Sequence, residues 1–194
     1  MALEKDAILK IFKETGALLE GHFILTSGLH SGTYFQCARV FQHPHHAESL
    51  AREIADHFKG ENIDVVVSPA VGGIVFGQEV ARLLPARAIF TERVEGRMVL
   101  RRGFELSAGE RVLVAEDVTT TGGSVSEVIG VAREAGAVVV AVTAVVDRSS
   151  GRALFDVPYF SLIQMDIVNY DPSDCPLCRA GSVAVKPGSR SLKS

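Results

Sequence analysis

The sequence contains no apolar run long enough to cross a membrane. Its longest run, residues 137–146, is interrupted by Thr143, whereas a helix that spans a bilayer needs about 20 predominantly apolar residues. The N-terminal sequence, MALEKDAILK, also carries charges where a signal peptide has an apolar core. These two absences lead us to expect a cytoplasmic protein with no membrane partner.

Lysine and histidine are absent from the middle of the chain. No lysine lies between Lys59 and Lys186, and no histidine follows His57. This region therefore offers no lysine or histidine as a general base, a general acid or a Schiff-base amine, and its cations are all arginines. Arginine stays charged and binds phosphate through two parallel hydrogen bonds. The composition favours anion binding over proton transfer.

A strong charge of either sign is also missing. The chain has 194 residues, 47% of them hydrophobic, and a net charge of −3, values that fit one globular domain with a full core. A dedicated nucleic-acid binder usually has a basic face, so nucleic acid is not an expected partner. We interpret residues 1–194 as a single domain.

Helical and extended apolar patterns alternate along the chain. The run at 137–146 fits a strand that is buried on both faces, as in a parallel sheet. The pattern predicts an α/β fold in which a mostly parallel sheet is flanked by helices. Helices are predicted at 2–15, 44–58, 74–84 and from about residue 124, and strands at 23–25, 33–41, 63–67, 87–90, 112–115, 137–146 and 159–164.

The stretch 111–136 combines a strand, two acids, a small polar loop and a helix. Backbone N–H groups can converge on an anion in the loop 119–124, because its glycines add no side chain, and the following helix begins with unpaired N–H groups. Glu116 and Asp117 precede this phosphate cup. Phosphate repels carboxylates, so we expect the acids to face sugar hydroxyls. The loop has neither the lysine of a P-loop nor a dinucleotide fingerprint.

A second loop, SPAVGG at 68–73, follows another predicted strand. Loops at the carboxyl ends of parallel strands form the ligand crevice of open α/β sheets, so this loop is a second candidate anion site. The segment 91–109 is polar and rich in arginine, with residues 98–100 as one arm of a hairpin that turns at Glu95 and Gly96. The ligand should therefore be a sugar with phosphate at both ends.

Two motifs resemble known families. The run VLVAEDVTTTGGS at 112–124 is similar to the phosphoribosyl-diphosphate signature of the type I phosphoribosyltransferases. The pattern F-x-L-T-S-G-x-H-S-x-x-Y-F at 23–35 resembles the segment that caps the base in orotate phosphoribosyltransferases. The resemblance implies the type I phosphoribosyltransferase fold with a small N-terminal hood, to which residues 1–42 contribute, and a C-terminal tail at 171–194. Many members of the family have a lysine where this chain has Thr26.

The resemblance also implies an activity and a set of site residues. Orotate would take the phosphoribosyl group of 5-phosphoribosyl 1-diphosphate, which gives orotidine 5′-monophosphate and pyrophosphate, a step of pyrimidine biosynthesis. The implied catalytic residues are Asp117, Glu116, Arg93, Arg101 and Arg102; those for phosphoribosyl diphosphate are Ala70, Val71, Gly72, Gly73, Glu116, Asp117, Thr119, Thr120, Thr121, Gly122, Gly123 and Ser124; those for orotate are Thr26, Ser27, Tyr34, Phe35, Thr121 and Arg148.

The family further implies a cofactor and a partner. Mg²⁺ would be held through the substrate, with no protein metal cage, and a homodimer would share its active sites. In the family a mobile loop at 91–109 closes over the neighbouring subunit's site and usually carries lysine and histidine beside arginine. This chain has only arginines there, so arginines would have to neutralise the charge.

Several alternatives stay open at this point. A purine-base phosphoribosyltransferase would share the phosphate loops, and a non-catalytic regulator could sense phosphoribosyl diphosphate and bind nucleic acid. Cys175 and Cys178 form one C-x-x-C pair, which is half a zinc site, so free thiols, a disulfide or a metal shared with a partner subunit are all compatible. Cys37 is expected to be buried in the strand 33–41, and the histidines at 43, 45 and 46 are interpreted as a solvated helix end.

Overall fold

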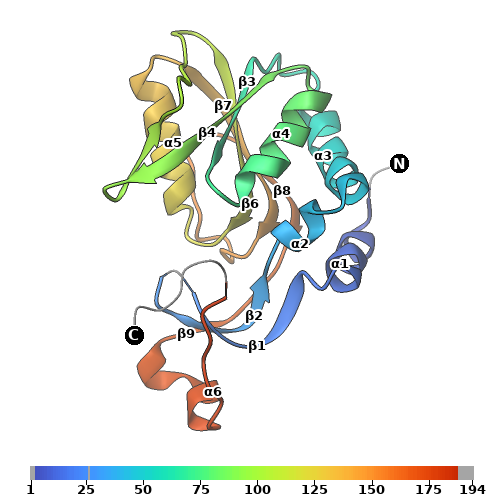
Figure 1. Cartoon of the computed structure of the whole chain (residues 1–194), viewed down its shortest axis with the longest axis vertical. Coiled ribbons are helices and arrows are strands. Elements are labelled where there is room, and N and C mark those ends of the chain that lie inside the picture. Colours follow the sequence, from blue (N-terminus) through green and yellow to red (C-terminus); the bar gives the residue numbers. More distant parts are fainter. Residues whose placement is uncertain (1–2, 26, 188–194) are drawn as a thin grey trace.

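The structure is a computed structural model that describes residues 3–25 and 27–187. These residues form two sheets, one with six strands and one with three, and the smaller sheet lies below the larger one in Figure 1. Within the described residues, no helix is long and apolar enough to pass through a bilayer. Thr26, an expected orotate contact, lies outside the described residues.

The larger sheet has the strand order β5-β4-β3-β6-β7-β8. Its five parallel strands are β3 (Val65–Pro69), β4 (Arg87–Val94), β6 (Arg111–Thr119), β7 (Val138–Asp147) and β8 (Tyr159–Gln164), while β5 (Arg97–Leu100) runs antiparallel at the edge. β7 is buried along nearly its whole length, as its continuous apolar run predicts. The α/β prediction is confirmed.

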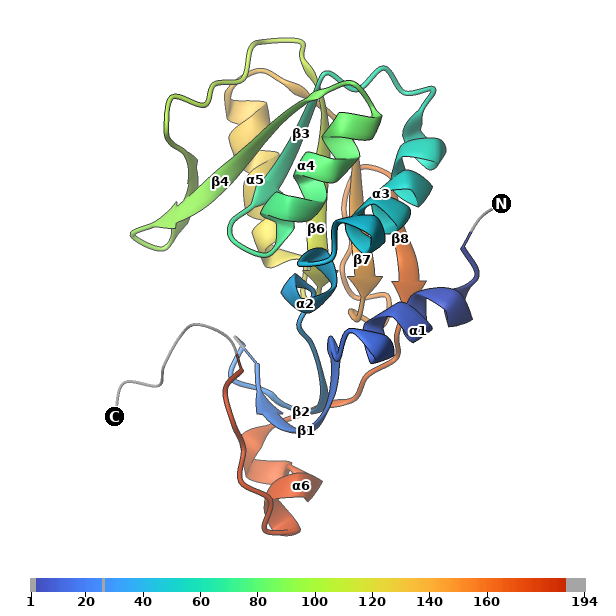
Figure 2. The same ribbon diagram turned by 45° about the vertical axis from the view of Figure 1, so that its right-hand side comes forward.

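Helices cover both faces of this sheet (Figures 1 and 2). Successive strand residues face opposite sides, so Val66 and Leu113 pack with α3 (Pro44–Phe58) and α4 (Gly73–Leu83), while Val67 packs with α5 (Gly123–Glu134) on the other side. α1 (Lys5–Glu14) adds Ile8 and Phe12 to the first of these two cores. Two separate apolar layers therefore hold the sheet.

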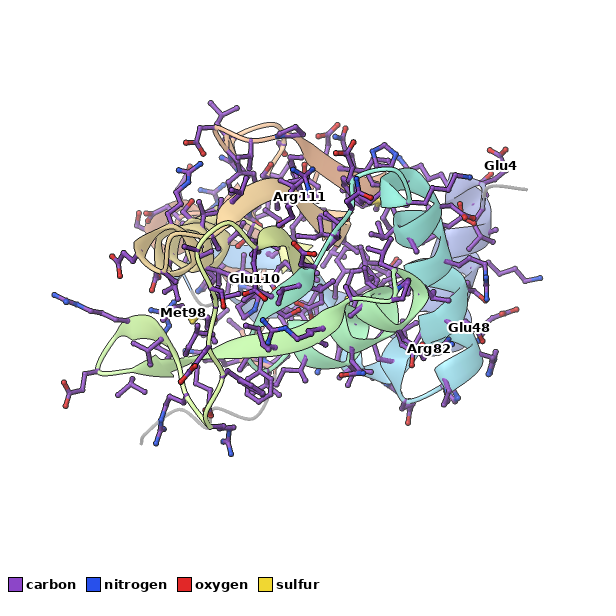
Figure 3. All side chains as sticks on the ribbon, turned by 90° about the horizontal axis from the view of Figure 1, so that it is seen from above. Glu4, Glu48, Arg82, Met98, Glu110 and Arg111 are labelled. Atoms are coloured by element: carbon purple, nitrogen blue, oxygen red, sulfur yellow. The ribbon has the colours of Figure 1, made fainter. Side chains whose placement is uncertain are left out.

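An ion pair at the surface joins two of the helices. Arg82 of α4 lies 3.3 Å from Glu48 of α3 (Figure 3). Both side chains are close to half exposed, and an exposed pair of this kind contributes about 1 kcal/mol at most. The two apolar layers, and not this pair, supply most of the stability.

The smaller sheet is the hood, and it is assembled from distant parts of the chain. β1 (Leu18–Ile24) pairs with β2 (His30–Phe35), and β2 pairs with β9 (Asn169–Tyr170). The 3₁₀ helix Pro172–Asp174 and α6 (Pro176–Arg179) follow β9 and lie beneath the hood (Figure 2). The chain then returns to β1, where Ile24 and His22 exchange backbone hydrogen bonds with Val185.

The predicted strand 33–41 is wrong in its second half. β2 ends at Phe35, and Ala38–Phe41 form the short helix α2. Val40 and Phe41 are adjacent and both buried, which one helical turn permits but a strand with one buried face does not. Cys37 is buried as expected, but it precedes this helix and does not lie in a strand.

The hairpin predicted in the arginine-rich segment is present. β4 and β5 pair antiparallel, with Val94 opposite Arg97. The turn residues Glu95 and Gly96 have φ angles of 48° and 85°. Positive φ at both central positions is the backbone of a tight two-residue hairpin turn, for which glycine is well suited.

Candidate active site

A cleft of about 740 Å³ lies where the carboxyl ends of the large sheet meet the hood. The hood contributes Ser27, Tyr34 and Phe35 to its lining, and the large sheet contributes Asp117 and Arg148. Crevices at this edge of an open α/β sheet are the usual place for ligands. The cleft therefore joins residues that are more than a hundred positions apart in sequence.

The loop 119–124 forms a small cup next to this cleft. It lines a pocket of about 50 Å³ together with Glu116, Val118 and Val125. Gly122 has a φ of 80°, and a Cβ atom there would lie 3.0 Å from the ring of Phe155, so only glycine fits without strain. α5 begins at the next residue, Gly123, and points its free N–H groups at the cup. This geometry suits one phosphate group.

The second loop, 70–73, lies directly against the two acids, because β3 and β6 are neighbours in the sheet. A Cβ atom on Gly72 would lie only 2.6 Å from Asp117 Oδ2, and one on Gly73 would lie 3.4 Å from Glu116 Oε1. The peptide bond between Ala70 and Val71 is cis. The glycines thus allow the loop to touch the acids.

Glu116 and Asp117 have different environments although they are adjacent. Glu116 is buried beside the small cup, and its Oε1 accepts a hydrogen bond of 3.1 Å from the backbone N–H of Asp117. Burial, followed by the charge of Asp117, raises the pKa of Glu116 well above its usual range. Asp117 lines the large cleft. One acid can therefore hold a proton while the other faces the ligand space.

Arg148 is the largest fully buried side chain in the described part of the chain. Its Nη2 donates hydrogen bonds to Ser31 Oγ at 3.0 Å and to Asn169 Oδ1 at 3.2 Å. Its Nε is buried without a hydrogen-bond partner among the described residues, and none of their carboxylates forms an ion pair with it.

The missing counter-charge has an energetic consequence. Burial lowers the pKa of Arg148 from its ordinary value, because a charge removed from water is destabilised. A buried and unpaired guanidinium is costly, and a planar carboxylate is its best geometric partner. Arg148 lines the cleft, so a carboxylate on a bound ligand would supply that counter-charge.

The predicted catalytic arginines do not gather in one place. Arg93 lines the cleft, where its guanidinium binds both oxygens of Glu127 at 2.8 and 3.0 Å. Arg102 binds Glu92 instead, at 2.9 Å, and lies 5.9 Å over the ring of Phe90. Neither Arg101 nor Arg102 lines the cleft. Only one of the three arginines therefore belongs to this chain's own cleft.

The structure brings most of the other predicted residues together. Ser27, Tyr34, Phe35, Thr121 and Arg148, the described members of the orotate set, line one cleft with Asp117, Thr120, Gly123 and Ser124. Thr119 and Gly122 lie in the adjoining cup, and residues 70–73 touch the acids from the neighbouring strand.

Sequence reasoning missed two residues that hold Arg148. Ser31 was inside the quoted hood motif, but the motif gave it no role. Asn169 lies in a strand of two residues, which has no periodic pattern that could predict it. Only the pairing of β9 with β2 places Asn169 opposite Ser31.

A parallel sheet with two candidate anion loops on adjacent strands, both next to a pair of acids, is the architecture expected of a phosphoribosyltransferase. The sequence matches the phosphoribosyl transferase domain over residues 37–177. It is 52% identical to the orotate phosphoribosyltransferase of Caldanaerobacter subterraneus subsp. tengcongensis, over 98% of this chain and 100% of that protein. It is 56% identical to that of Chlorobium phaeobacteroides strain BS1, over 98% of both.

Solved structures agree with these relatives. The orotate phosphoribosyltransferase of Aeropyrum pernix superposes with a TM-score of 0.68 at 27% identity, covering 81% of this chain and 93% of that one. An adenine phosphoribosyltransferase from Thermoanaerobacter pseudethanolicus shares the fold, with a TM-score of 0.59 at 18% identity over 69% of this chain and 88% of that one. The chain belongs to the orotate phosphoribosyltransferase family.

Proposed function

We propose that this chain transfers the phosphoribosyl group of 5-phosphoribosyl 1-diphosphate to orotate, giving orotidine 5′-monophosphate and pyrophosphate in pyrimidine biosynthesis. Its curated relatives at about half identity carry this enzyme's name. The observation that favours orotate over other bases is Arg148, a buried cation in the cleft with no acidic partner among the described residues. Orotate is a base that carries a carboxylate.

The phosphate groups of the donor would occupy the two loops. The cup at 119–124 binds the 5′-phosphate through backbone N–H groups and threonine hydroxyls. The loop 70–73 binds the pyrophosphate, and its glycines lie against Asp117 and Glu116. Asp117 and Glu116 bind the ribose hydroxyls between them. In this arrangement Glu116, whose pKa is raised, donates a hydrogen bond and Asp117 accepts one.

Orotate would enter from the hood side. Its carboxylate pairs with Arg148, whose guanidinium is held in place by Ser31 and Asn169. Tyr34 and Phe35 give the base an aromatic wall. A guanidinium fixed at Nη2 is pre-organised, so orotate binding does not have to order it.

The chemical step requires charge stabilisation more than proton transfer. Displacement at the anomeric carbon passes through a state with positive charge on the ribose ring and negative charge on the leaving pyrophosphate. Asp117 faces this region and stabilises the positive charge, while loop N–H groups and Arg93 stabilise the negative charge. No described residue that lines the cleft is a lysine or a histidine, which fits a reaction that needs no strong protein base.

Mg²⁺ fits this arrangement as a substrate-bound ion. Asp117 offers carboxylate oxygens next to the proposed pyrophosphate loop, and oxygen is the ligand type that Mg²⁺ prefers. When bound with the donor, the ion would neutralise part of the diphosphate charge. Asp117 is the side chain of this chain that would face it.

The two remaining predicted arginines, Arg101 and Arg102, support the proposal of a second copy of the chain. Arg101 and Arg102 are exposed and follow β5, and the β4–β5 hairpin projects away from the sheet (Figure 1). Their positive charge has no role in this chain's cleft. We infer a homodimer in which this segment reaches the cleft of the partner subunit, so that each site is completed by two chains.

A nucleobase panel tests the proposal. Pyrophosphate release is measured with orotate, uracil, adenine and hypoxanthine, each with and without Mg²⁺. Orotate should exceed uracil by about 10³-fold or more in kcat/KM, because uracil leaves Arg148 without its counter-charge. Preference for a purine would replace the proposal with a purine phosphoribosyltransferase. Absence of turnover together with salt-dependent nucleic-acid binding would favour a regulator.

A further inference from the structure

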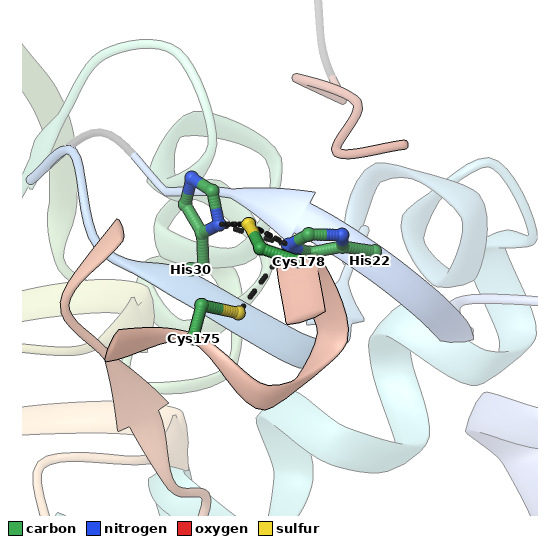
Figure 4. A group of neighbouring side chains, drawn as sticks. All are labelled: His22, His30, Cys175 and Cys178. Atoms are coloured by element: carbon green, nitrogen blue, oxygen red, sulfur yellow. Dashed lines mark hydrogen bonds between the residues drawn. The ribbon is translucent and has the colours of Figure 1, made fainter. Parts of the chain in front are cut away.

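His22, His30, Cys175 and Cys178 converge beneath the hood (Figure 4). One ligand-type atom from each of them lies within 4.8 Å of the other three. The histidines come from β1 and β2, whereas Cys175 and Cys178 flank and enter α6. No other cluster of three or more such residues occurs in the described ranges. The C-x-x-C pair, which the sequence indicates as half of a metal site, therefore lies next to two histidines of the same chain.

The distances match a tetrahedral metal site. Zn–N bonds of about 2.05 Å and Zn–S bonds of about 2.3 Å place a nitrogen and a sulfur ligand about 3.6 Å apart. His22 Nε2 lies 3.5 Å from Cys175 Sγ and 3.7 Å from Cys178 Sγ. His30 Nδ1 lies 3.3 Å from Cys178 Sγ. The two nitrogens are 2.8 Å apart, and a metal would separate them to about 3.3 Å.

The outer nitrogen of His22 sets its tautomer. Nδ1 lies 2.9 Å from the carbonyl oxygen of Ser182, and a carbonyl can only accept, so the proton is on Nδ1. The lone pair of Nε2 then points into the cluster. A metal-bound histidine almost always donates its other N–H to an oxygen in this way.

Burial and charge favour the same interpretation. His22, His30 and Cys175 are buried, and Cys178 is exposed. Two thiolates neutralise one divalent cation, so the bound cluster carries no net charge, which suits a buried position. The exposed cysteine leaves a path for the ion to enter. A tetrahedral set of two sulfurs and two nitrogens is typical of zinc.

We propose that His22, His30, Cys175 and Cys178 bind one structural Zn²⁺ that fastens the C-terminal segment to the hood. All four positions of the tetrahedron are filled by protein, so the site is closed and non-catalytic. Binding removes one proton from each cysteine thiol and releases both to the solvent. This site is separate from the substrate-bound Mg²⁺ and does not depend on the proposed reaction.

The position of the site explains how the metal would stabilise the hood. The hood is three short strands, too small a sheet to bury much apolar surface, and structural metals stabilise such elements. His30 precedes Ser31, and the pairs His30–Tyr170 and Ser31–Asn169 are consecutive in the sheet. The ion therefore fixes the strands that hold Arg148. If the proposed function is correct, loss of the ion raises the KM for orotate more than that for phosphoribosyl diphosphate.

Metal analysis of the purified full chain tests the site. The wild type, supplied with Zn²⁺ during expression and then desalted, should contain about one zinc per chain. Cys178→Ser and His30→Ala should each retain less than about a tenth of that zinc, because three ligands bind far more weakly than four. Full zinc content in both variants would overturn the proposal.

His45→Ala is the matched control. His45 lies in the other histidine group, with its ring centroid 4.0 Å from that of His46. This variant should keep one zinc per chain. Loss of zinc from it would indicate that the metal binds at the start of α3 instead. Iron in place of zinc, or a metal-free wild type with a Cys175–Cys178 disulfide, would also overturn the assignment.

A second measurement needs only the wild type, in case the variants do not fold. A mercurial reagent blocks thiols stepwise while a chromogenic chelator reports free zinc. Zinc should appear in proportion to modification of two thiols, at about one ion per two thiols blocked. Co²⁺ exchanged into the site should show the visible absorption of a tetrahedral thiolate complex. Zinc release independent of the thiols would contradict the proposal, and neither readout depends on turnover.

Discussion

At the scale of single residues, the two adjacent acids differ because Glu116 is buried whereas Asp117 lines the cleft. Glu116 lies beside the small cup, and the side chains of both acids contact the loop 70–73. The adjacency of the two acids was visible in the sequence. Their difference in burial could not be predicted from the sequence. It depends on the loop 70–73, which lies 40 or more residues earlier in the chain and packs against both acids.

Glu116 should make stability depend on pH. Burial raises its folded pKa above the unfolded value, so the folded chain holds the proton that the unfolded chain has already lost. The free energy of unfolding therefore falls as pH rises through this window, by up to about 1.4 kcal/mol per pH unit. Glu116→Gln cannot titrate, so it should gain stability relative to the wild type as pH rises above about 4.3. Urea unfolding at several pH values measures the difference.

Glu127→Gln is the control, because Glu127 should make the free energy of unfolding depend on pH in the opposite direction. A hydrogen bond from Arg93 lowers the pKa of Glu127, so the contribution of Glu127 is present at neutral pH and lost as pH falls through the folded pKa. This variant should differ from the wild type at neutral pH and approach it in acid. A Glu116→Gln curve parallel to that of the wild type would contradict the assignment to Glu116.

Arg148 should control the affinity for orotate. Arg148→Ala removes at least one charge-assisted hydrogen bond to a carboxylate, which is worth about 1.5–3 kcal/mol, so the KM for orotate should rise by roughly 10-fold to more than 100-fold. The KM for phosphoribosyl diphosphate should change little, because the guanidinium of Arg148 is held on the hood side by Ser31 and Asn169. Steady-state kinetics with each substrate varied in turn makes the comparison.

Arg148→Lys distinguishes the contribution of the positive charge to orotate binding from that of the planar shape of the guanidinium. Lysine keeps the positive charge but cannot form the planar, two-pronged contact, so its KM for orotate should lie between those of the wild type and the alanine variant. An equal loss of affinity for both substrates would show that Arg148 acts only on the structure of the hood.

At the scale of elements, local patterns predicted the sheet and its helices well. α3 and β8 begin and end where the sequence places them, because α3 buries one clear apolar stripe and β8 is a short, largely apolar run. The pattern failed at 33–41, where packing against α3 and α4 overrides the extended appearance of the sequence. β9 could not be predicted either, because a strand of two residues exists only through its partner β2.

The close approach of the loop 70–73 to the acids should be sensitive to a single methyl group. Gly72→Ala places a Cβ within 2.6 Å of Asp117 Oδ2, so the loop or the carboxylate must move. A displacement of about 1 Å in an active site can cost 10²-fold in rate, and we expect a loss of that order in kcat/KM.

Gly130→Ala is the matched control. Gly130 lies inside α5, and a Cβ there would meet nothing within 4 Å. Alanine is the better helix former, so this variant should keep its activity and gain about 0.5–1 kcal/mol of stability. Kinetics and thermal unfolding of both variants test the pair. Full activity in Gly72→Ala would show that the loop does not need this contact.

At the scale of the whole molecule, the cleft of one chain holds only part of the predicted set of catalytic groups. Asp117 and Arg93 line the cleft, whereas Arg101 and Arg102 lie outside it. The sequence resemblance anticipated a site shared between subunits, and the position of the segment after β5 is what such a site would need. Neither a sequence pattern nor a single chain can fix the partner's position, so the shared site stays a prediction that must be tested with two chains.

Mixed dimers provide that test. Asp117→Asn and the double variant Arg101→Ala/Arg102→Ala should each be nearly inactive alone, because each lacks a charge that the transition state needs. Random pairing of equal amounts makes half of the dimers mixed, and each mixed dimer has one site with Asp117 from one chain and both arginines from the other. Activity should therefore recover to about a quarter of the wild-type value. If the arginines served their own chain, every site in the mixed dimer would lack one component, and mixing would restore nothing.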